Sequence, residues 1–254
     1  MNLTYAIGDV HGRDDVLRPL IRALREDTAH LDRRFIFLGD IVDRGQNAKE
    51  CLEIVDDTIA RYPDSQLILG NHDERFWHAL AGILRPDELA VWLEELGGWQ
   101  SAQSYFGGFR PTFEDFTKIV HQYYDHHLDI MQEAVDKVEM GKFCLVHAGV
   151  KPGVKMADQD PHDLRWIRQE FLEFTGDFEK IIVHGHTITD SELPEIHKNR
   201  IALDSGSYRT GRISAAAFID EELTGFICAE SIEGNIVLRR FDANMEALEA
   251  SAAG

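Results

Sequence analysis

The chain has 254 residues, of which 44% are hydrophobic and 28% charged, proportions typical of a globular protein with a sizeable buried core. Its formal net charge of −19 argues against a protein that grips nucleic-acid phosphates over a broad basic surface. No apolar run approaches the roughly 20 residues that a membrane-spanning helix needs, so we expect no membrane partner.

The amino-terminal segment and the cysteines favour one cellular compartment. Residues 1–10 lack the basic start followed by an apolar stretch that marks a cleaved signal peptide. Cys51, Cys144 and Cys228 are odd in number, far apart and set among apolar neighbours, which favours reduced, buried thiols over a disulfide framework. We therefore expect a cytoplasmic protein.

Short apolar runs of strand length alternate with helical patterns along the chain. The runs that read as strands occupy residues 3–7, 34–38, 66–69, 142–146, 180–183 and 200–203. Apolar residues at helical spacing fill 16–24 and 51–59, with Pro19 expected near the first turn of one helix and Asn47 as the N-cap of the other. This alternation predicts βαβ units and an α/β fold.

The middle and the end of the chain break this alternation. From about residue 74 to 140 the spacing looks helical, with Trp92 on the apolar stripe and a long helix predicted for 112–138. We interpret this stretch as a helical cap insertion within a single domain, 1–254. The last apolar runs predict an antiparallel meander and a frayed Ala-rich tail, the runs being 215–219, 225–229 and 235–241.

Five of the predicted strands are followed by short motifs that combine glycine with potential metal ligands. The motifs are GDVHG at 8–12, GDIVDRG at 39–45, GNHD at 70–73, HAG at 147–149 and GHT at 185–187. Ligands of open α/β sheets bind where the loops after the strands converge, and glycine lets the backbone turn sharply there. Five such motifs in order therefore predict one shared site.

The residue types in these motifs predict a catalytic metal centre. Carboxylate and imidazole ligands suit Mn²⁺, Fe or Zn²⁺, and none of the five motifs contains the cysteine of a structural thiolate zinc site. Two metal ions that share a bridging carboxylate can clamp both oxygens of an in-line displacement at phosphorus. Asp40 is the candidate bridge.

Together the five motifs resemble those of the phosphoprotein phosphatase family of calcineurin-like metallophosphoesterases, whose bacterial members include lambda-type phosphatases and diadenosine tetraphosphatases. The resemblance spans residues 8–187. It implies an αββα sandwich of mixed β-sheets flanked by helices, with two divalent metal ions, Mn²⁺ first and Fe or Zn²⁺ as alternatives.

The family's metal ligands map onto matching positions of this chain. The resemblance implies that the first ion is held by Asp9, His11 and Asp40. It implies that the second ion is held by Asp40, Asn71, His147 and His186.

The same resemblance assigns roles around the metal ions. His72 matches the histidine that protonates the leaving oxygen, and Asp43 matches the carboxylate that orients it and favours its protonated form. Arg44 matches a phosphate-binding arginine, and Arg168 is preferred to Arg165 as the second one. Tyr208, in a late turn that lines the family's pocket, is expected near the substrate.

Three departures from the family pattern bear on the branch of the superfamily and on one contact to phosphate. Leu69 stands where many members have arginine, and Asp73 where most have glutamate, so one contact to phosphate is expected to be missing. Ile188 replaces the second histidine of the Gly-His-x-His pattern found in the wider superfamily. With the Asp43-Arg44 pair, this places the chain in the phosphatase branch.

Histidines outside the motifs have simpler expected roles. His184 is expected in the core or behind the metal ligands, because it neighbours a predicted ligand on a buried strand. His121, His126 and His127 are expected on a solvated or pocket-rim face, because they lie among polar residues of the helical stretch.

The resulting hypothesis is a two-metal phosphatase that hydrolyses phosphomonoesters. A metal-bridging hydroxide attacks phosphorus directly, since no motif offers a serine or cysteine nucleophile. The first reading is a serine/threonine-type protein phosphatase acting on a phosphorylated protein. The alternatives are a dinucleoside tetraphosphate hydrolase, whose substrate is a small phosphate compound, and a catalytically silent metal-binding regulatory module, which the intact His72, Asp43 and Arg44 oppose.

Overall fold

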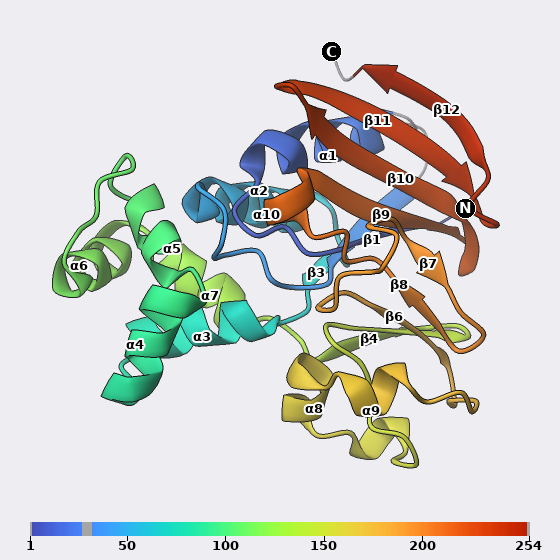
Figure 1. The fold of residues 1–254 in the computed structure, drawn as a ribbon, viewed down its shortest axis with the longest axis horizontal. Helices are drawn as coiled ribbons and strands as arrows, with labels where there is room; N and C mark the ends of the chain where they lie inside the picture. Colours follow the sequence, from blue (N-terminus) through green and yellow to red (C-terminus); the bar gives the residue numbers. More distant parts are fainter. Residues whose placement is uncertain (1, 27–31, 253–254) are drawn as a thin grey trace.

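A computed structural model describes residues 2–26 and 32–252, and within them two β-sheets carry helices on their outer sides (Figure 1). From edge to edge, the strands of the seven-stranded sheet are β12 (Ala247–Ala252), β11 (Asn235–Asp242), β10 (Glu222–Ile232), β9 (Arg212–Ile219), β1 (Asn2–Ile7), β2 (Asp32–Phe37) and β3 (Gln66–Leu67). Those of the five-stranded sheet are β4 (Lys137–Met140), β5 (Phe143–Val146), β6 (Ile181–His184), β8 (Arg200–Ala202) and β7 (Glu195–Ile196).

Helices fill the connections between these strands. The α-helices are α1 (Asp14–Glu26), α2 (Ala48–Arg61), α3 (Asn71–Leu80), α4 (Pro86–Glu95), α5 (Gly98–Ser104), α6 (Phe113–Tyr123), α7 (His126–Gln132), α8 (Pro161–Trp166), α9 (Gln169–Leu172) and α10 (Ser207–Thr210), with a 3₁₀ turn at Met156–Asp158. α1 and α2 connect the parallel strands β1, β2 and β3, as the βαβ pattern predicts. Figure 1 shows α3 to α7 gathered on one side of the molecule.

The central strand β1 is buried on both faces. Tyr5 pairs with Phe35 of β2 in a parallel register and with Ala217 of β9 in an antiparallel one. Because side chains alternate along a strand, Tyr5 packs with the helices while Ala6 packs against the second sheet. Burial on both faces explains the apolar residues Leu3, Tyr5, Ala6 and Ile7, while the buried hydroxyl of Thr4 accepts a hydrogen bond from Arg34 Nε at 3.0 Å.

Three apolar clusters separate four layers. One lies between the seven-stranded sheet and the helices α1 and α2, and continues into α3 to α7. The second lies between the sheets, where the rings of Phe143 and Phe218 are 4.9 Å apart. The third packs Phe171 of α9 against Cys144 and Ile182 on the outer face of the five-stranded sheet. This helix–sheet–sheet–helix order confirms the predicted αββα sandwich with mixed sheets.

The middle of the chain differs from its predicted secondary structure. The long helix expected at 112–138 is two helices, α6 and α7, followed by strand β4. In β4, Val138 and Met140 are buried whereas Lys137 and Glu139 face outward. This alternation has the period of a strand, and pairing with β5 buries it. The division into one domain with a helical insertion at about 74–140 stays a prediction.

Three smaller expectations are also resolved. Pro19, expected near the first turn of α1, lies inside the helix, just beyond that turn. Asn47 occupies the N-cap position of α2, but its side chain makes no capping hydrogen bond. The Ala-rich tail is not frayed, because 247–252 forms β12 and pairs antiparallel with β11. Backbone hydrogen bonds to the meander suffice to order it.

The three cysteines have the environment that their apolar neighbours predict. Cys51, Cys144 and Cys228 are buried free thiols, as predicted. Among the described residues, no helix is both long and apolar enough to cross a membrane.

Phe218→Ala tests the contact between the sheets. Phe218 is fully buried there, so its truncation leaves a cavity, and we expect the free energy of unfolding to fall by about 3–5 kcal/mol in urea titrations. Ile232→Ala, at a 39% exposed position of the neighbouring strand, is the matched control and should change it by less than about 0.5 kcal/mol. Equal small losses in both variants would contradict the packing of the two sheets.

Candidate two-metal active site

Loops from both sheets meet at the carboxyl ends of β1, β2, β3, β5 and β6. Backbone hydrogen bonds tie these loops to one another: His11 N donates to Asp40 O at 2.8 Å, and Gly185 N donates to His147 O at 2.8 Å. A Cβ on Gly39 would lie 2.6 Å from the Gly70 backbone, so only glycine allows that approach. The five motifs therefore form one site, as the sequence predicts.

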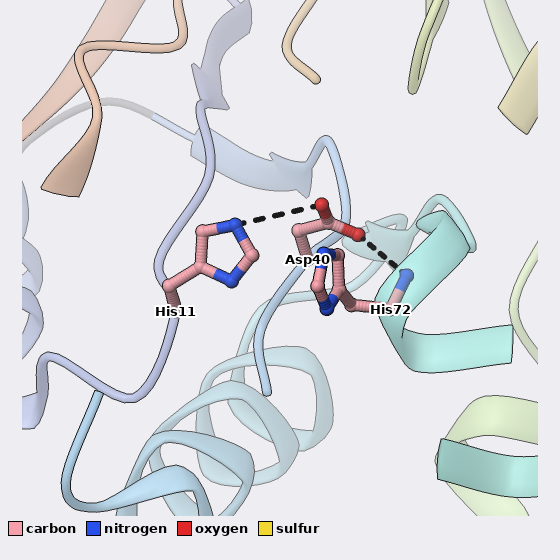
Figure 2. A group of neighbouring side chains, drawn as sticks. All are labelled: His11, Asp40 and His72. Carbon is pink, nitrogen blue, oxygen red and sulfur yellow. Dashed lines mark hydrogen bonds and ion pairs between the residues drawn. The ribbon is translucent and has the colours of Figure 1, made fainter. Parts of the chain in front are cut away.

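The carboxylate of Asp40 lies at the centre of this site (Figure 2). Its Oδ2 is 3.6 Å from His11 Nε2, and its Oδ1 is 3.4 Å from His147 Nε2. Oδ1 also accepts a hydrogen bond from the backbone N–H of His72 at 2.9 Å. Two groups of potential ligands share it, His11, Asp40 and His72 in one and Asp40, His147 and His186 in the other.

The two rings that face Asp40 present lone pairs to it. His11 Nδ1 lies 2.9 Å from Val42 O, and His147 Nδ1 lies 2.7 Å from Leu38 O. Because a carbonyl oxygen only accepts, each Nδ1 carries the hydrogen and each Nε2 of a neutral ring is an acceptor. Burial keeps the rings neutral by lowering the pKa of both, that of His11 to about 3.

Acceptors accumulate around His147 without a donor between them. Asn71 Oδ1 lies 3.0 Å from His147 Nε2, which also faces the carboxylate of Asp40. His186 belongs to the same group; its Nε2 is buried without a hydrogen-bond partner, and burial lowers its pKa to about 2. Buried acceptors that converge in this way are stabilised by a cation.

Buried carboxylates add an excess of negative charge. Asp9, both of whose oxygens accept from His186 N at 3.1 Å, has a pKa raised well above its usual value by burial and by Asp204 and Asp40. Burial, with Asp40 nearby, raises the pKa of Asp73 to about 7 and that of Asp204 to about 6. A raised pKa means that a carboxyl resists ionisation among like charges unless a cation compensates, and the oxygen and nitrogen donors of this site fit divalent metal ions.

The predicted metal ligands thus lie together. The residues that line this site from the five loops are Asp9, His11, Asp40, Asn71, His147 and His186. Which of them binds the first ion and which the second stays a prediction.

A second buried pair adjoins the metal ligands. His72 Nδ1 lies 2.8 Å from Asp43 Oδ2, and Asp43 is fully buried. Burial opposes protonation of His72, but the carboxylates of Asp40 and Asp43 outweigh it and raise the pKa of the ring. The pair therefore favours an imidazolium beside the metal site, as a proton donor requires.

The helical region supplies two partners of Asp43 that the sequence did not reveal. Trp92 Nε1 donates to Asp43 Oδ2 at 2.8 Å, and Ser101 Oγ donates to Asp43 Oδ1 at 2.6 Å. Trp92 is in the core, as expected, but its indole N–H has this further contact. Nothing in the local sequence marks Ser101, which lies 58 residues from Asp43.

Asp73 is another site residue whose role the sequence did not reveal. Its Oδ1 accepts from the backbone N–H of Ile41 at 2.9 Å and of Val42 at 3.3 Å, while its Oδ2 accepts from Gly70 N at 3.2 Å. These bonds fix the loop that carries Asp40. The one feature of the sequence that could have indicated this role is the position of Asp73 directly after Gly70-Asn71-His72.

The predicted phosphate-binding residues lie at the rim. The Arg44 guanidinium lies over the Tyr208 ring at 5.6 Å, and the Tyr208 ring packs edge-on against His11 at 5.3 Å. Arg168 Nη1 lies 3.2 Å from Thr187 Oγ1, beside His186, whereas Arg165 forms ion pairs with Glu74 and Asp136. Arg168 is therefore available to a ligand, but its role and that of Tyr208 stay predictions.

Several site residues adopt the left-handed backbone conformation that side chains rarely take. The φ angles are 47° at His11, 53° at Asp40, 68° at Asp43, 66° at Arg44 and 65° at His186. Each such conformation costs about 1–3 kcal/mol unless the surroundings enforce it, and such residues cluster at functional sites. The backbone bonds among the loops provide that enforcement here.

The remaining histidines separate into two cases. His184 is buried with its ring edge-on to Phe171 at 5.0 Å, so its expected core position is confirmed. The expectation of a solvated or rim face is wrong for His127, whose side chain is fully buried beside Tyr105 and Tyr124. The flanking aromatic residues, not its polar neighbours, determine its burial.

Known proteins resemble this chain in sequence. Residues 4–212 match the family model for calcineurin-like phosphoesterases. The chain is 29% identical over 154 residues to the symmetrical bis(5'-nucleosyl)-tetraphosphatase of Actinobacillus succinogenes, covering 61% of this chain and 46% of that protein. It is 25% identical over 227 residues to PrpE, the asymmetrical bis(5'-nucleosyl)-tetraphosphatase of Halalkalibacterium halodurans, covering 85% of this chain and 90% of that one.

A solved structure shows the same fold. The structure of a proposed diadenosine tetraphosphatase superposes with a TM-score of 0.56 at 17% identity, covering 87% of this chain and 91% of that chain. Against the first two curated relatives, however, this chain spans only about half of their length, 46% and 51%.

Asp40→Asn tests the central position of that carboxylate. Removing the charge shared by both ligand groups should leave less than one bound Mn²⁺ per chain, measured by elemental analysis after gel filtration. Asp43→Asn, a fully buried carboxylate outside both groups, is the control and should keep its metal. Full metal content in Asp40→Asn would contradict the assignment.

Proposed function

The chain belongs to the calcineurin-like phosphoesterase family, and we propose that it is a two-metal hydrolase that acts on dinucleoside tetraphosphates. The observation that carries the proposal is the convergence of buried His, Asp and Asn acceptors on Asp40. Such a site suits phosphate chemistry, because divalent ions stabilise the negative charge that gathers on phosphate oxygens.

The named relatives favour the nucleotide reading over the phosphoprotein reading. Both of the relatives described above are named bis(5'-nucleosyl)-tetraphosphatases, one symmetrical and one asymmetrical. The serine/threonine protein phosphatase reading, which the sequence motifs placed first, therefore becomes the second candidate. The two names differ in which anhydride bond is cleaved, so the products must be identified.

The structure offers room beyond the metal ligands for more than one phosphate. A cavity of about 660 Å³ is lined by Arg44, Gly45 and Tyr208 on the active-site side and by Arg13 and Ser104 further out. Tyr208 contacts the ring of His11, so the cavity adjoins the metal ligands. Asp14 and Asp15 also line the cavity, and Asp15 already accepts two hydrogen bonds from Arg13, at 2.8 and 2.7 Å. Arg44 is therefore the cation proposed to face a polyphosphate that extends along this cavity.

Metal ions in this site would be held by the Asp, His and Asn side chains around Asp40, with Mn²⁺ proposed first and Fe or Zn²⁺ as alternatives. Bound there, divalent ions supply Lewis acidity and lower the pKa of a water that serves as the nucleophile. Donor types alone admit several first-row ions. A cytoplasmic location, where nucleotides are abundant, is part of the proposal.

The protein's own groups handle the leaving oxygen and the phosphate. His72, held and kept protonated by Asp43, donates its proton from Nε2 to the departing oxygen. Arg44 and Arg168 are proposed to bind the non-bridging oxygens, since a guanidinium matches their geometry. The intact His72–Asp43 pair argues against a catalytically silent module.

His72→Asn tests the proton donor. We expect turnover of diadenosine tetraphosphate to fall by roughly 10²-fold, because the amide cannot donate a proton as an acid does. Metal content should not change, because His72, although near His11 and Asp40, is not one of the six predicted ligands. His78→Asn, on the same helix but outside both ligand groups, is the control and should retain turnover. Near-normal turnover in His72→Asn would show that His72 is not the proton donor.

A substrate comparison in the presence of Mn²⁺ tests the substrate class. Diadenosine tetraphosphate should exceed a phosphoserine peptide and an aryl phosphate in kcat/KM by roughly 10-fold or more. Chromatography of the products then distinguishes two ADP from ATP plus AMP. If the phosphopeptide has the highest kcat/KM, the protein is a protein phosphatase and the proposed substrate class is wrong.

A further inference from the structure

A second cluster of potential metal ligands lies outside the active site, between α2 and α7. Glu53 of α2 faces His126 and His127 at the start of α7, and the ligand atoms of all three lie within 4.8 Å of one another. Glu53 Oε1 is 3.5 Å from His126 Nε2 and 3.3 Å from His127 Nε2. Ligands bound about 2.1 Å from a tetrahedral ion are about 3.4 Å apart, so these separations already match.

His127 has the surroundings of a metal ligand. Its side chain is fully buried, its Nδ1 lies 2.6 Å from Tyr105 Oη, and its Nε2 has no hydrogen-bond partner. The Glu53 carboxylate lies 3.3 Å from this Nε2 but makes no hydrogen bond with it, and a buried polar atom without a hydrogen bond is unusual in a folded protein. Metal-binding imidazoles characteristically have their second nitrogen held by a neighbouring polar group, as Tyr105 holds Nδ1 here.

The hydrogen bond and the orientation of the His127 ring suit a metal ligand. The Tyr105 hydroxyl can either accept from Nδ1–H or donate to Nδ1, and a bound ion selects the tautomer in which Nδ1–H donates and Nε2 presents its lone pair toward Glu53. The Tyr124 ring stacks on His127 at 5.5 Å and fixes its plane.

The other two ligands give access from solvent. The side chains of Glu53 and His126 are 40% and 41% exposed, which leaves an approach for an ion and space for a water ligand. The Nζ of Lys49 lies 5.3 Å from the centre of the Tyr124 ring, and its positive charge opposes the binding of a cation nearby. The Glu53 carboxylate offsets it locally.

We propose that Glu53, His126 and His127 bind a third divalent transition-metal ion of the Zn²⁺ class, separate from the active-site ions. Two imidazoles and one carboxylate, completed by water, form a familiar donor set for Zn²⁺. The ion ties α2, which begins shortly after the Asp40 loop, to α7. This inference does not depend on the proposed catalytic function.

The location of the site gives the ion a bracing role. Tyr105, which holds His127, is the C-cap of α5, the helix that carries Ser101. Ser101 bonds the side chain of Asp43. The ion therefore fastens the helical region to α2 close to the helix that supports the His72–Asp43 pair.

Zinc stoichiometry tests the proposal. The full chain is stripped with a chelator, loaded with Zn²⁺, passed through a desalting column and analysed for metal. Wild-type protein should carry about one Zn²⁺ more per chain than Glu53→Gln or His126→Ala. Both positions are partly exposed, so both variants are expected to fold, which circular dichroism checks; His127→Ala is avoided because that ring is buried.

His197→Ala is the matched control. His197 Nε2 lies 3.3 Å from Glu195 Oε2 on the surface, and the pair belongs to none of the three-residue ligand groups of the described residues. Its zinc content should equal that of wild type. Zn²⁺ should also raise the Tm of wild type and His197→Ala by more than that of the two site variants.

Equal zinc content in wild type, Glu53→Gln and His126→Ala would overturn the proposal, as would a wild-type protein that binds no zinc beyond its active-site ions. Mn²⁺-supported turnover, measured on the same samples, should be retained by both site variants. A failure of the third site would therefore appear in the metal content and Tm, while a failure of the catalytic proposal would appear in turnover.

Discussion

The buried carboxylate of Asp40 is the constraint on which the site depends. Lone pairs of His11 and His147 point at it, and Asn71 and the unpartnered Nε2 of His186 lie in the same group of acceptors. Without cations this arrangement would place negative charge and unpaired acceptors among largely buried side chains. Divalent metal ions, which these side chains could hold, would offset this cost.

The rest of the fold keeps that arrangement in place. The αββα sandwich brings the carboxyl ends of β1 to β3 next to those of β5 and β6. Asp73 holds the Asp40 loop by its backbone N–H groups, and Trp92 and Ser101 hold Asp43 from the helical region. The helices α4 and α5 thus support the residue that orients His72, in addition to covering one side of the site.

The sequence predicted the parts of this structure that local patterns encode. Strands with apolar runs, the amphipathic α1 and α2, and Asp40 or His147 directly after a strand are visible in a short window. Ser101 could not be predicted, because its role is a contact across 58 residues. The strands β4 and β12 gain their order from pairing with β5 and β11, and the burial of His127 comes from Tyr105 and Tyr124. The order of β12 and the burial of His127 depend on tertiary contacts that their own segments do not encode, whereas β4 carries the two-residue period of a strand within a stretch predicted to be helical.

Anomalous diffraction from crystals grown with Mn²⁺ tests the central claim most directly. The account predicts two anomalous peaks roughly 3.5–4 Å apart, both in contact with the Asp40 carboxylate, with His11 beside one peak and His147 beside the other. A single peak at this site, or two peaks that do not share Asp40, would contradict it.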